Sequence, residues 1–212
     1  MLRGYVFGYG SLVADALPLT AGVERPVAPV WGRLDDHRRR WTVTMRNRDR
    51  VNDPKHVVDE ATGRRPDLWV TYVTLDRVPG TTVNGIAVPV DDERLAVFDV
   101  RELNYERVAV GELFTADPGE AWPPPGDGPA LPVWTYVASA AGRERYEQGR
   151  QAQRAVVRAG YRERVEGAFR DRGAAAWRDY QASTDPPAVP TRDGLRLVRT
   201  PPRAGGIAPT GS

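Results

Sequence analysis

The chain contains no cysteine among its 212 residues. This absence excludes disulfide bonds, cysteine nucleophiles and cysteine-ligated zinc sites together. Histidine is nearly absent as well, because His37 and His56 are the only two. Both stand in polar, loop-like surroundings, so the sequence argues against a metal centre built on histidine.

Long apolar runs are also missing. No apolar stretch reaches the roughly eighteen residues that a membrane-spanning helix needs, and no charged-then-apolar leader is present. We therefore expect neither a membrane span nor a signal peptide, and together with the absence of cysteine this fits a cytoplasmic protein. The apolar fraction of 41% and the charged fraction of 27% are typical of a soluble globular protein.

Neither sign of charge dominates. Thirty Lys and Arg residues face 28 Asp and Glu residues, so the formal net charge is only +2. The basic run at Arg38, Arg39 and Arg40 follows the acidic pair Asp35 and Asp36, which predicts a solvated surface rather than a nucleic-acid interface. No nucleic-acid partner is expected.

Short β-branched and aromatic runs recur along the first two thirds of the chain and predict strands. A polar stretch over residues 46–67 predicts a long surface loop, and the turn signal at residues 78–80 separates two of the runs. Strands at this spacing predict an α+β fold with a small mixed, largely antiparallel β-barrel flanked by helices. The predicted strands cover residues 5–7, 27–31, 41–45, 68–75, 83–90, 107–114 and 133–137.

Helical spacing appears in the middle of the chain and near its end. Asp91 or Asp92 is a suitable cap for a helix that ends near Glu102. A second helical region begins at residue 143 and breaks at 159–160, and a third follows it. We predict one domain over residues 1–182, followed by a Pro/Gly-rich tail over 183–212 that packs loosely.

A glycine-rich turn, 7–12, follows the first predicted strand. Gly8 and Gly10 bracket Tyr9, and Ser11 and Leu12 end the turn. Glycine permits positive φ and a close approach to the backbone, so such a turn can present successive N–H groups to an anion. The alternative is an ordinary tight turn at the end of a strand.

Glu102 stands at a position where a carboxylate is unexpected. Leu95 and Glu102 are seven residues apart and point almost the same way on a helix, with Phe98 on the same stripe. A carboxylate on a core-facing stripe would be partly desolvated, which suits a general base or acid. The alternative is a glutamate at the helix end that pairs with Arg101 or Arg107 and faces water.

The order of these parts resembles the γ-glutamylcyclotransferase superfamily, including its ChaC-like and avirulence-induced-like branches. Tyr9-Gly10-Ser11-Leu12 is similar to the family's motif after the first strand, and Asp99 to Arg107 is similar to the segment that carries its catalytic glutamate. Tyr136-Val137 and Tyr146 match later tyrosine positions. The resemblance covers about residues 4–172, without the 46–67 segment, and Leu103 stands where the family usually has glycine.

The resemblance implies cleavage of a γ-glutamyl amide by internal cyclisation to 5-oxoproline and a free amine. Glu102 would be the general base and acid, and the amides of residues 10–12 would hold the substrate's carboxylate or the developing oxyanion. No metal or organic cofactor is implied, and the expected partner is a small γ-glutamyl molecule. The substrate-binding residues implied are Tyr9, Gly10, Ser11, Leu12, Tyr105, Tyr136 and Tyr146.

Two other functions remain open at this point. One is a non-catalytic module on the same scaffold that binds a small ligand or a partner. The other is a tailoring enzyme that removes a γ-glutamyl protecting group in secondary metabolism. The sequence leaves the leaving amine and the oligomeric state undetermined.

Overall fold

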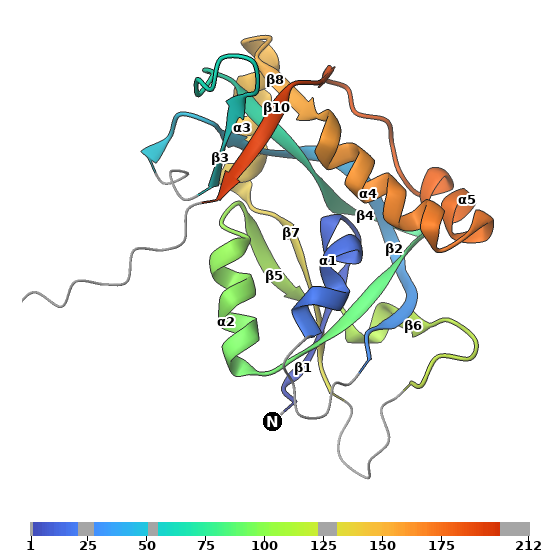
Figure 1. Cartoon of the computed structure of the whole chain (residues 1–212). Helices are drawn as coiled ribbons and strands as arrows, with labels where there is room; N and C mark the ends of the chain where they lie inside the picture. Colours follow the sequence, from blue (N-terminus) through green and yellow to red (C-terminus); the bar gives the residue numbers. More distant parts are fainter. Residues whose placement is uncertain (1, 21–27, 51–54, 123–130, 200–212) are drawn as a thin grey trace, which may run out of the picture.

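A computed structural model describes residues 2–20, 28–50, 55–122 and 131–199 of the chain (Figure 1). An eight-stranded sheet curls around the core, and helices flank it. The expected α+β class with a curled, largely antiparallel sheet is therefore confirmed. In chain order the elements are β1 (Gly4–Gly8), α1 (Ser11–Thr20), β2 (Val30–Arg46), β3 (Lys55–Asp59), β4 (Trp69–Val90), α2 (Asp92–Arg101), β5 (Tyr105–Ala109), the 3-10 helix η2 (Gly111–Leu113), β6 (Phe114–Ala116), β7 (Val133–Ala138), α3 (Ala140–Gln151), β8 (Ala155–Arg158), α4 (Ala159–Asp171), α5 (Ala174–Ala182), β9 (Thr191–Arg192) and β10 (Leu195–Arg199).

The sheet runs in the order β5-β7-β1-β4-β2-β6, with β8 paired to β4 and β9 paired to β8. The first strand, β1, lies between β4 and β7, and all five of its residues are buried. A fully buried central strand is expected to be apolar along its whole length, as this one is. Its end leads directly into α1, so the core fixes the position of the glycine-rich turn.

Two long strands replace four of the predicted short ones. β2 and β4 pair antiparallel from Val30↔Ala87 to Arg46↔Trp69. The turn expected at residues 78–80 is wrong as a chain reversal, because these residues lie inside β4. The pairing shifts from Asp35↔Thr82 to His37↔Arg77, so residues 78–81 of β4 form a bulge opposite the single residue Asp36.

The bulge also moves one arginine into the core. Buried positions on β2 are even-numbered up to Leu34 and odd-numbered from His37 to Val43, because an extra residue reverses which face each side chain takes. Arg39 is consequently fully buried, at 0% exposure. The expectation of a solvated surface at residues 38–40 is therefore wrong for Arg39.

The remaining predicted strands hold in part. β7 covers the run predicted at residues 133–137, whereas the run at 107–114 divides into β5, η2 and the start of β6. Ala155 and Val156 were expected in a helix, but they lie in β8, which pairs parallel with β4 at Trp69 and Val70. The β-branched pair Val156 and Val157 favours this strand, and the helix α4 begins only after it.

The 46–67 segment is more than the surface loop that was expected. It contains β3, which pairs antiparallel with β10 from Lys55↔Arg199 to Asp59↔Leu195. Val57 is fully buried and Leu195 is 4% exposed, so residues from the expected tail pack firmly here. The part of the tail beyond residue 199, like the start of the strand expected at 27–31, lies outside the described residues.

Helix α2 packs on the sheet through a small second core. Leu95 and Phe98 are buried with Val6, Val90 and Tyr136. Through the parts of the chain that the structure describes, no helix has both the length and the apolar character needed to cross a membrane.

Candidate functional site

The turn between β1 and α1 needs its glycines for close packing. A Cβ atom on Gly10 would lie 2.8 Å from Val73 Cγ1, and one on Gly8 would lie 2.7 Å from Leu12 Cβ. Neither glycine adopts the positive φ that the sequence suggested as one reason for its presence. The glycines therefore allow β4 and α1 to approach the turn closely.

The turn places the start of a helix at the site. Val13 N donates to Gly10 O at 3.0 Å, which makes Gly10 the residue that precedes the first helical turn. The first N–H groups of an α-helix have no acceptor within the helix, and the helix dipole adds partial positive charge there. The N–H groups of Ser11 and Leu12 are thus suited to bind an anion.

Helix α2 presents Glu102 from the opposite side. Its N-cap is Asp91, one of the two caps that the sequence allowed, and Asp91 accepts from Arg94 N at 2.8 Å. Leu95 and Phe98 are buried on the inner stripe, and Glu102 is the C-cap residue, with its N–H donating to Phe98 O at 3.0 Å. The helix therefore ends with the glutamate beside the core.

The Glu102 carboxylate combines features of both interpretations drawn from the sequence. Its side chain is only 19% exposed, yet Oε1 lies 3.0 Å from Arg101 Nε in an ion pair. The inward stripe thus carries Glu102 toward the core, and a neighbouring guanidinium holds its orientation.

Glu102 and the glycine-rich turn line one small pocket of about 50 Å³. A larger cavity of about 640 Å³ lies next to this pocket, and Ser11, Arg101, Glu102, Tyr105 and Tyr161 line both. The two halves of the predicted site are therefore brought together. The residues that line the small pocket are Val6, Phe7, Gly8, Tyr9, Gly10, Ser11, Leu12, Val73, Phe98, Arg101, Glu102, Tyr105, Tyr136 and Tyr161.

The predicted tyrosines differ in their placement. Tyr105 and Tyr136 line the small pocket, and their hydroxyls donate to Val73 O at 2.9 Å and to Asp99 Oδ1 at 2.6 Å. The Tyr9 hydroxyl points into the protein and donates to Tyr136 O at 2.5 Å. Tyr146 is buried in the main core and lines neither cavity, so the structure does not bring it to this site.

Burial keeps the tyrosines around Glu102 protonated. It raises the pKa of Tyr9, Tyr105 and Tyr161 well above the usual range, and the charge of Glu102 raises each further. Burial likewise raises the pKa of Tyr72 to about 12. The pocket is therefore surrounded by neutral phenol groups, which can donate hydrogen bonds but do not take up protons at neutral pH.

A charged network next to the turn was not anticipated from the sequence. Arg101 Nη2 donates to Asp15 Oδ2 at 3.1 Å and to Ser11 Oγ at 3.3 Å, while Arg164 from α4 pairs with the other Asp15 oxygen. Asp15 lies one helical turn after Ser11 on α1, and this spacing was the available signal. The network ties α1, α2 and α4 together around the pocket.

Arg39 supports the turn from behind. Its Nε donates to Tyr9 O at 2.9 Å and its Nη1 to Ser183 Oγ at 2.8 Å, and its Nη2 bonds Asn84. Its guanidinium also lies 4.8 Å from the Phe169 ring centroid. A buried cation is stable only when its donors are satisfied, so Arg39 fixes the carbonyl of the residue before Gly10.

This chain is similar to known proteins in its structure but not detectably in its sequence. No family model matches the sequence, and no curated protein matches it significantly. The human uncharacterized protein loc79017 aligns with a TM-score of 0.50 at 12% identity, over 90% of this chain and 92% of that one. This similarity shows a shared fold alone.

Other similar solved structures include two described as γ-glutamyl cyclotransferases. One has a TM-score of 0.48 at 12% identity and covers 87% of this chain and 88% of its own. The other, from yeast and specific to glutathione, has a TM-score of 0.41 at 11% identity over 63% of this chain and 68% of its own.

Proposed function

We propose that this protein is a γ-glutamylcyclotransferase-like enzyme that cleaves a γ-glutamyl amide to 5-oxoproline and a free amine. The observation that carries the proposal is the shared pocket, where the N–H groups at the start of α1 and the Glu102 carboxylate line the same space. The order of sequence motifs supports the same reaction.

The chemistry needs few protein groups, because the nucleophile belongs to the substrate. The substrate's α-amine forms a bond to its own γ-carbonyl carbon, and the bond from that carbon to the leaving nitrogen breaks. A bent glutamyl group held in this way gains the advantage of proximity, worth roughly 7–11 kcal/mol in well-oriented intramolecular reactions. Water is neither consumed nor released.

Glu102 moves the proton in this scheme. Its carboxylate takes a proton from the α-ammonium, which frees the lone pair for attack, and returns that proton to the departing nitrogen. The N–H groups of Ser11 and Leu12 bind the α-carboxylate or the developing oxyanion. The Tyr105 hydroxyl, held at Val73 O, closes the pocket on the side of the sheet.

The test is product analysis on a panel of γ-glutamyl amides. We expect 5-oxoproline and free amine in equal amounts, and no product from the same amides with an acetylated α-amine, because the blocked nitrogen cannot attack. Release of glutamate instead of 5-oxoproline would show hydrolysis and contradict the proposal, as would a lack of product across the panel.

The second candidate function is a non-catalytic module that binds a small ligand. The ion pair between Glu102 and Arg101 favours it, because a carboxylate held by a cation can be purely structural. Calorimetry with the same γ-glutamyl amides separates the two functions. Binding without conversion over extended incubation identifies the module, whereas conversion to 5-oxoproline excludes it.

A further inference from the structure

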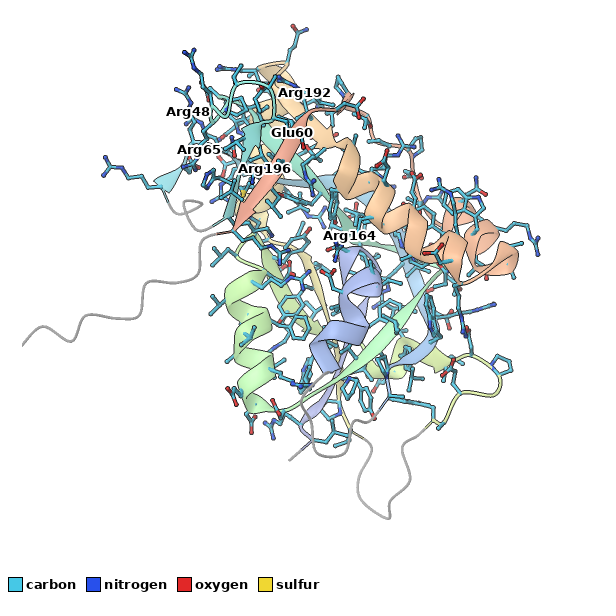
Figure 2. All side chains as sticks on the ribbon, viewed as in Figure 1. Arg48, Glu60, Arg65, Arg164, Arg192 and Arg196 are labelled. Atoms are coloured by element: carbon cyan, nitrogen blue, oxygen red, sulfur yellow. The ribbon has the colours of Figure 1, made fainter. Side chains whose placement is uncertain are left out.

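The large cavity next to Glu102 has walls that the family motifs do not cover. Its lining residues come from α1, α2 and α4, from β4, β5 and β8, and from the strands β3 and β10. Those two strands come from the 46–67 segment and from beyond residue 172, which are the parts of the chain outside the resemblance. Figure 2 labels Arg164 on α4 and Arg196 on β10, two elements that contact each other beside the site.

The lining of this cavity is strongly basic. Among the residues that the structure describes, six of its side chains are cationic and two are acidic, the latter being Asp15 and Glu102. The only lysine of the chain is among the six. The cationic residues are Lys55, Arg101, Arg158, Arg164, Arg196 and Arg199.

The two acids are already occupied. Asp15 pairs with Arg101 and Arg164, and Glu102 pairs with Arg101. The other four cations, among the residues that the structure describes, form no ion pair with a carboxylate. They come from three elements: Lys55 from β3, Arg158 from β8, and the remaining two from β10.

Among the residues that the structure describes, two buried polar atoms at the cavity have neither a hydrogen bond nor an ion pair. The Tyr72 hydroxyl and Arg158 Nε are both buried without a hydrogen bond, and both residues line the cavity. Tyr72 is only 7% exposed. A buried donor without an acceptor is costly, so these atoms indicate a place for a ligand that can accept hydrogen bonds.

The electrostatic surroundings of Lys55 also favour binding of an anion in the cavity. Burial lowers its pKa, Glu102 raises it, and the nearby positive charges of Arg101 and Arg199 lower it again. Gathering like charges in a partly desolvated cavity is unfavourable, and a bound anion would relieve both the repulsion and the desolvation.

We propose that this cavity holds the leaving amine of the substrate, and that this amine carries at least two negative charges. The inference rests on the proposed function, because it places the glutamyl group in the small pocket and the leaving group beyond Glu102. Carboxylates and phosphate share the required chemistry, since arginine and lysine bind both. The strands β3 and β10 then determine substrate specificity.

The first experiment compares four substrates with the unmodified protein. γ-Glutamylglutamate and γ-glutamyl-phosphoethanolamine have doubly charged leaving groups, γ-glutamylglutamine has one charge there, and γ-glutamylethylamide has none. We expect kcat/KM to rise by about tenfold with each added charge, as for a charge-assisted hydrogen bond. Comparison of the first two substrates distinguishes carboxylate from phosphate. The advantage should shrink at high salt.

The second experiment replaces arginines of β10 that line the large cavity and leaves Glu102 and the glycine-rich turn intact. Arg196→Gln and Arg199→Gln should each lower kcat/KM for the preferred dianionic substrate by about tenfold and leave γ-glutamylethylamide unaffected. Arg77→Gln removes an exposed arginine that pairs with Asp36 away from the cavity and serves as the matched control. Arg199→Lys, which keeps the charge, should restore most of the selectivity.

The outcomes separate this inference from the proposed function. Turnover of the neutral and dianionic substrates at equal efficiency, or an equal loss on both in the Arg196 and Arg199 variants, overturns the inference while the cyclotransferase function stands. Failure to convert any of the four substrates overturns both. The substrate comparison needs no variant, so a variant that fails to fold leaves the inference testable.

Discussion

Arg39 is a buried cation whose hydrogen bonds hold the backbone before Gly10. Burial lowers its pKa to about 10, while the nearby Tyr180 and Tyr9 hydroxyls raise it, so the guanidinium remains charged at neutral pH. Its stacking on Phe169 and Tyr180 places it between α4, α5 and the turn. The site therefore depends on a residue that does not line it.

Replacement of Arg39 tests this role. Arg39→Met leaves Tyr9 O and the Asn84 side chain without their donor in a buried place, so the free energy of unfolding should fall by roughly 3 kcal/mol. Arg33→Met on the same strand removes two partly exposed ion pairs, with Asp117 and Asp179, and should change the free energy of unfolding by less than about 1 kcal/mol. Equal losses in denaturant titrations of the two variants would refute a special role for Arg39.

Gly10 is constrained by its neighbours and not by its backbone angles. Gly10→Ala places a Cβ 2.8 Å from Val73 Cγ1 and 3.4 Å from the Tyr161 hydroxyl, so we expect a loss of about 1–3 kcal/mol in the free energy of unfolding together with reduced turnover. Gly167→Ala in α4 meets no atom within 4 Å and should stabilise the protein by about 1 kcal/mol. A neutral Gly10→Ala would contradict the close packing.

The β3–β10 pair joins two segments that the sequence did not connect. Leu195 and Val57 belong to the main core, although the stretches around them are polar or rich in proline and glycine. Leu195→Ala should lower the free energy of unfolding by about 2–5 kcal/mol, whereas Val100→Ala at an exposed position should change it by less than about 0.5 kcal/mol. Thermal or denaturant unfolding measures both, and a small effect at Leu195 would contradict firm packing of β10.

Local pattern accounts for some elements and long-range pairing for the rest. Asp91, Leu95 and Phe98 carry a cap and an apolar stripe, so α2 and the inward position of Glu102 follow from neighbouring residues. β3 and β8 each contain a β-branched valine pair that favours a strand locally, but their partners β10 and β4 lie far away in the sequence, so no short window identifies the pairing. The switch from even- to odd-numbered buried residues on β2 likewise could not be predicted from the sequence, because the bulge that causes it depends on how β2 pairs with β4.

The candidate site was predictable to the extent that its motifs are local. The glycine-rich turn, Glu102, Tyr105 and Tyr136 were predicted and meet in one pocket. The basic side of the large cavity, formed by Lys55, Arg158, Arg164, Arg196 and Arg199, was not predicted. These residues come from β3, β8, α4 and β10 and converge only in the folded chain. Tyr146 matches a tyrosine position of the family and was expected to bind substrate, but it is buried in the main core.

All eight tyrosines of the chain share one electrostatic property. The pKa of each is raised, with burial as the largest cause, and for Tyr72 and Tyr180 it reaches about 12. A group whose folded pKa lies above its unfolded value contributes stability that is complete below the unfolded value and is lost as the pH rises through the folded one.

Alkaline titration should therefore show a cooperative response. Above pH 10, each tyrosine that stays neutral in the fold lowers the free energy of unfolding by about 1.4 kcal/mol per pH unit. Arg39 and Lys55, whose pKa values are lowered by burial, act in the opposite direction. Tyrosinate absorbance should remain low until the protein unfolds and then appear in one step. Gradual titration around pH 10 in the folded protein would contradict this expectation.

The proposed function is tested most directly by measuring the rate of 5-oxoproline formation by two variants, Glu102→Gln and its control Glu106→Gln. Glu106 is an exposed glutamate four residues away on β5, so it matches the chemical change without touching the pocket. We predict that Glu102→Gln lowers kcat/KM by at least about a hundredfold with an unchanged unfolding transition, because proton transfer is lost, while Glu106→Gln stays at the unmodified rate. Full turnover by Glu102→Gln would contradict the account.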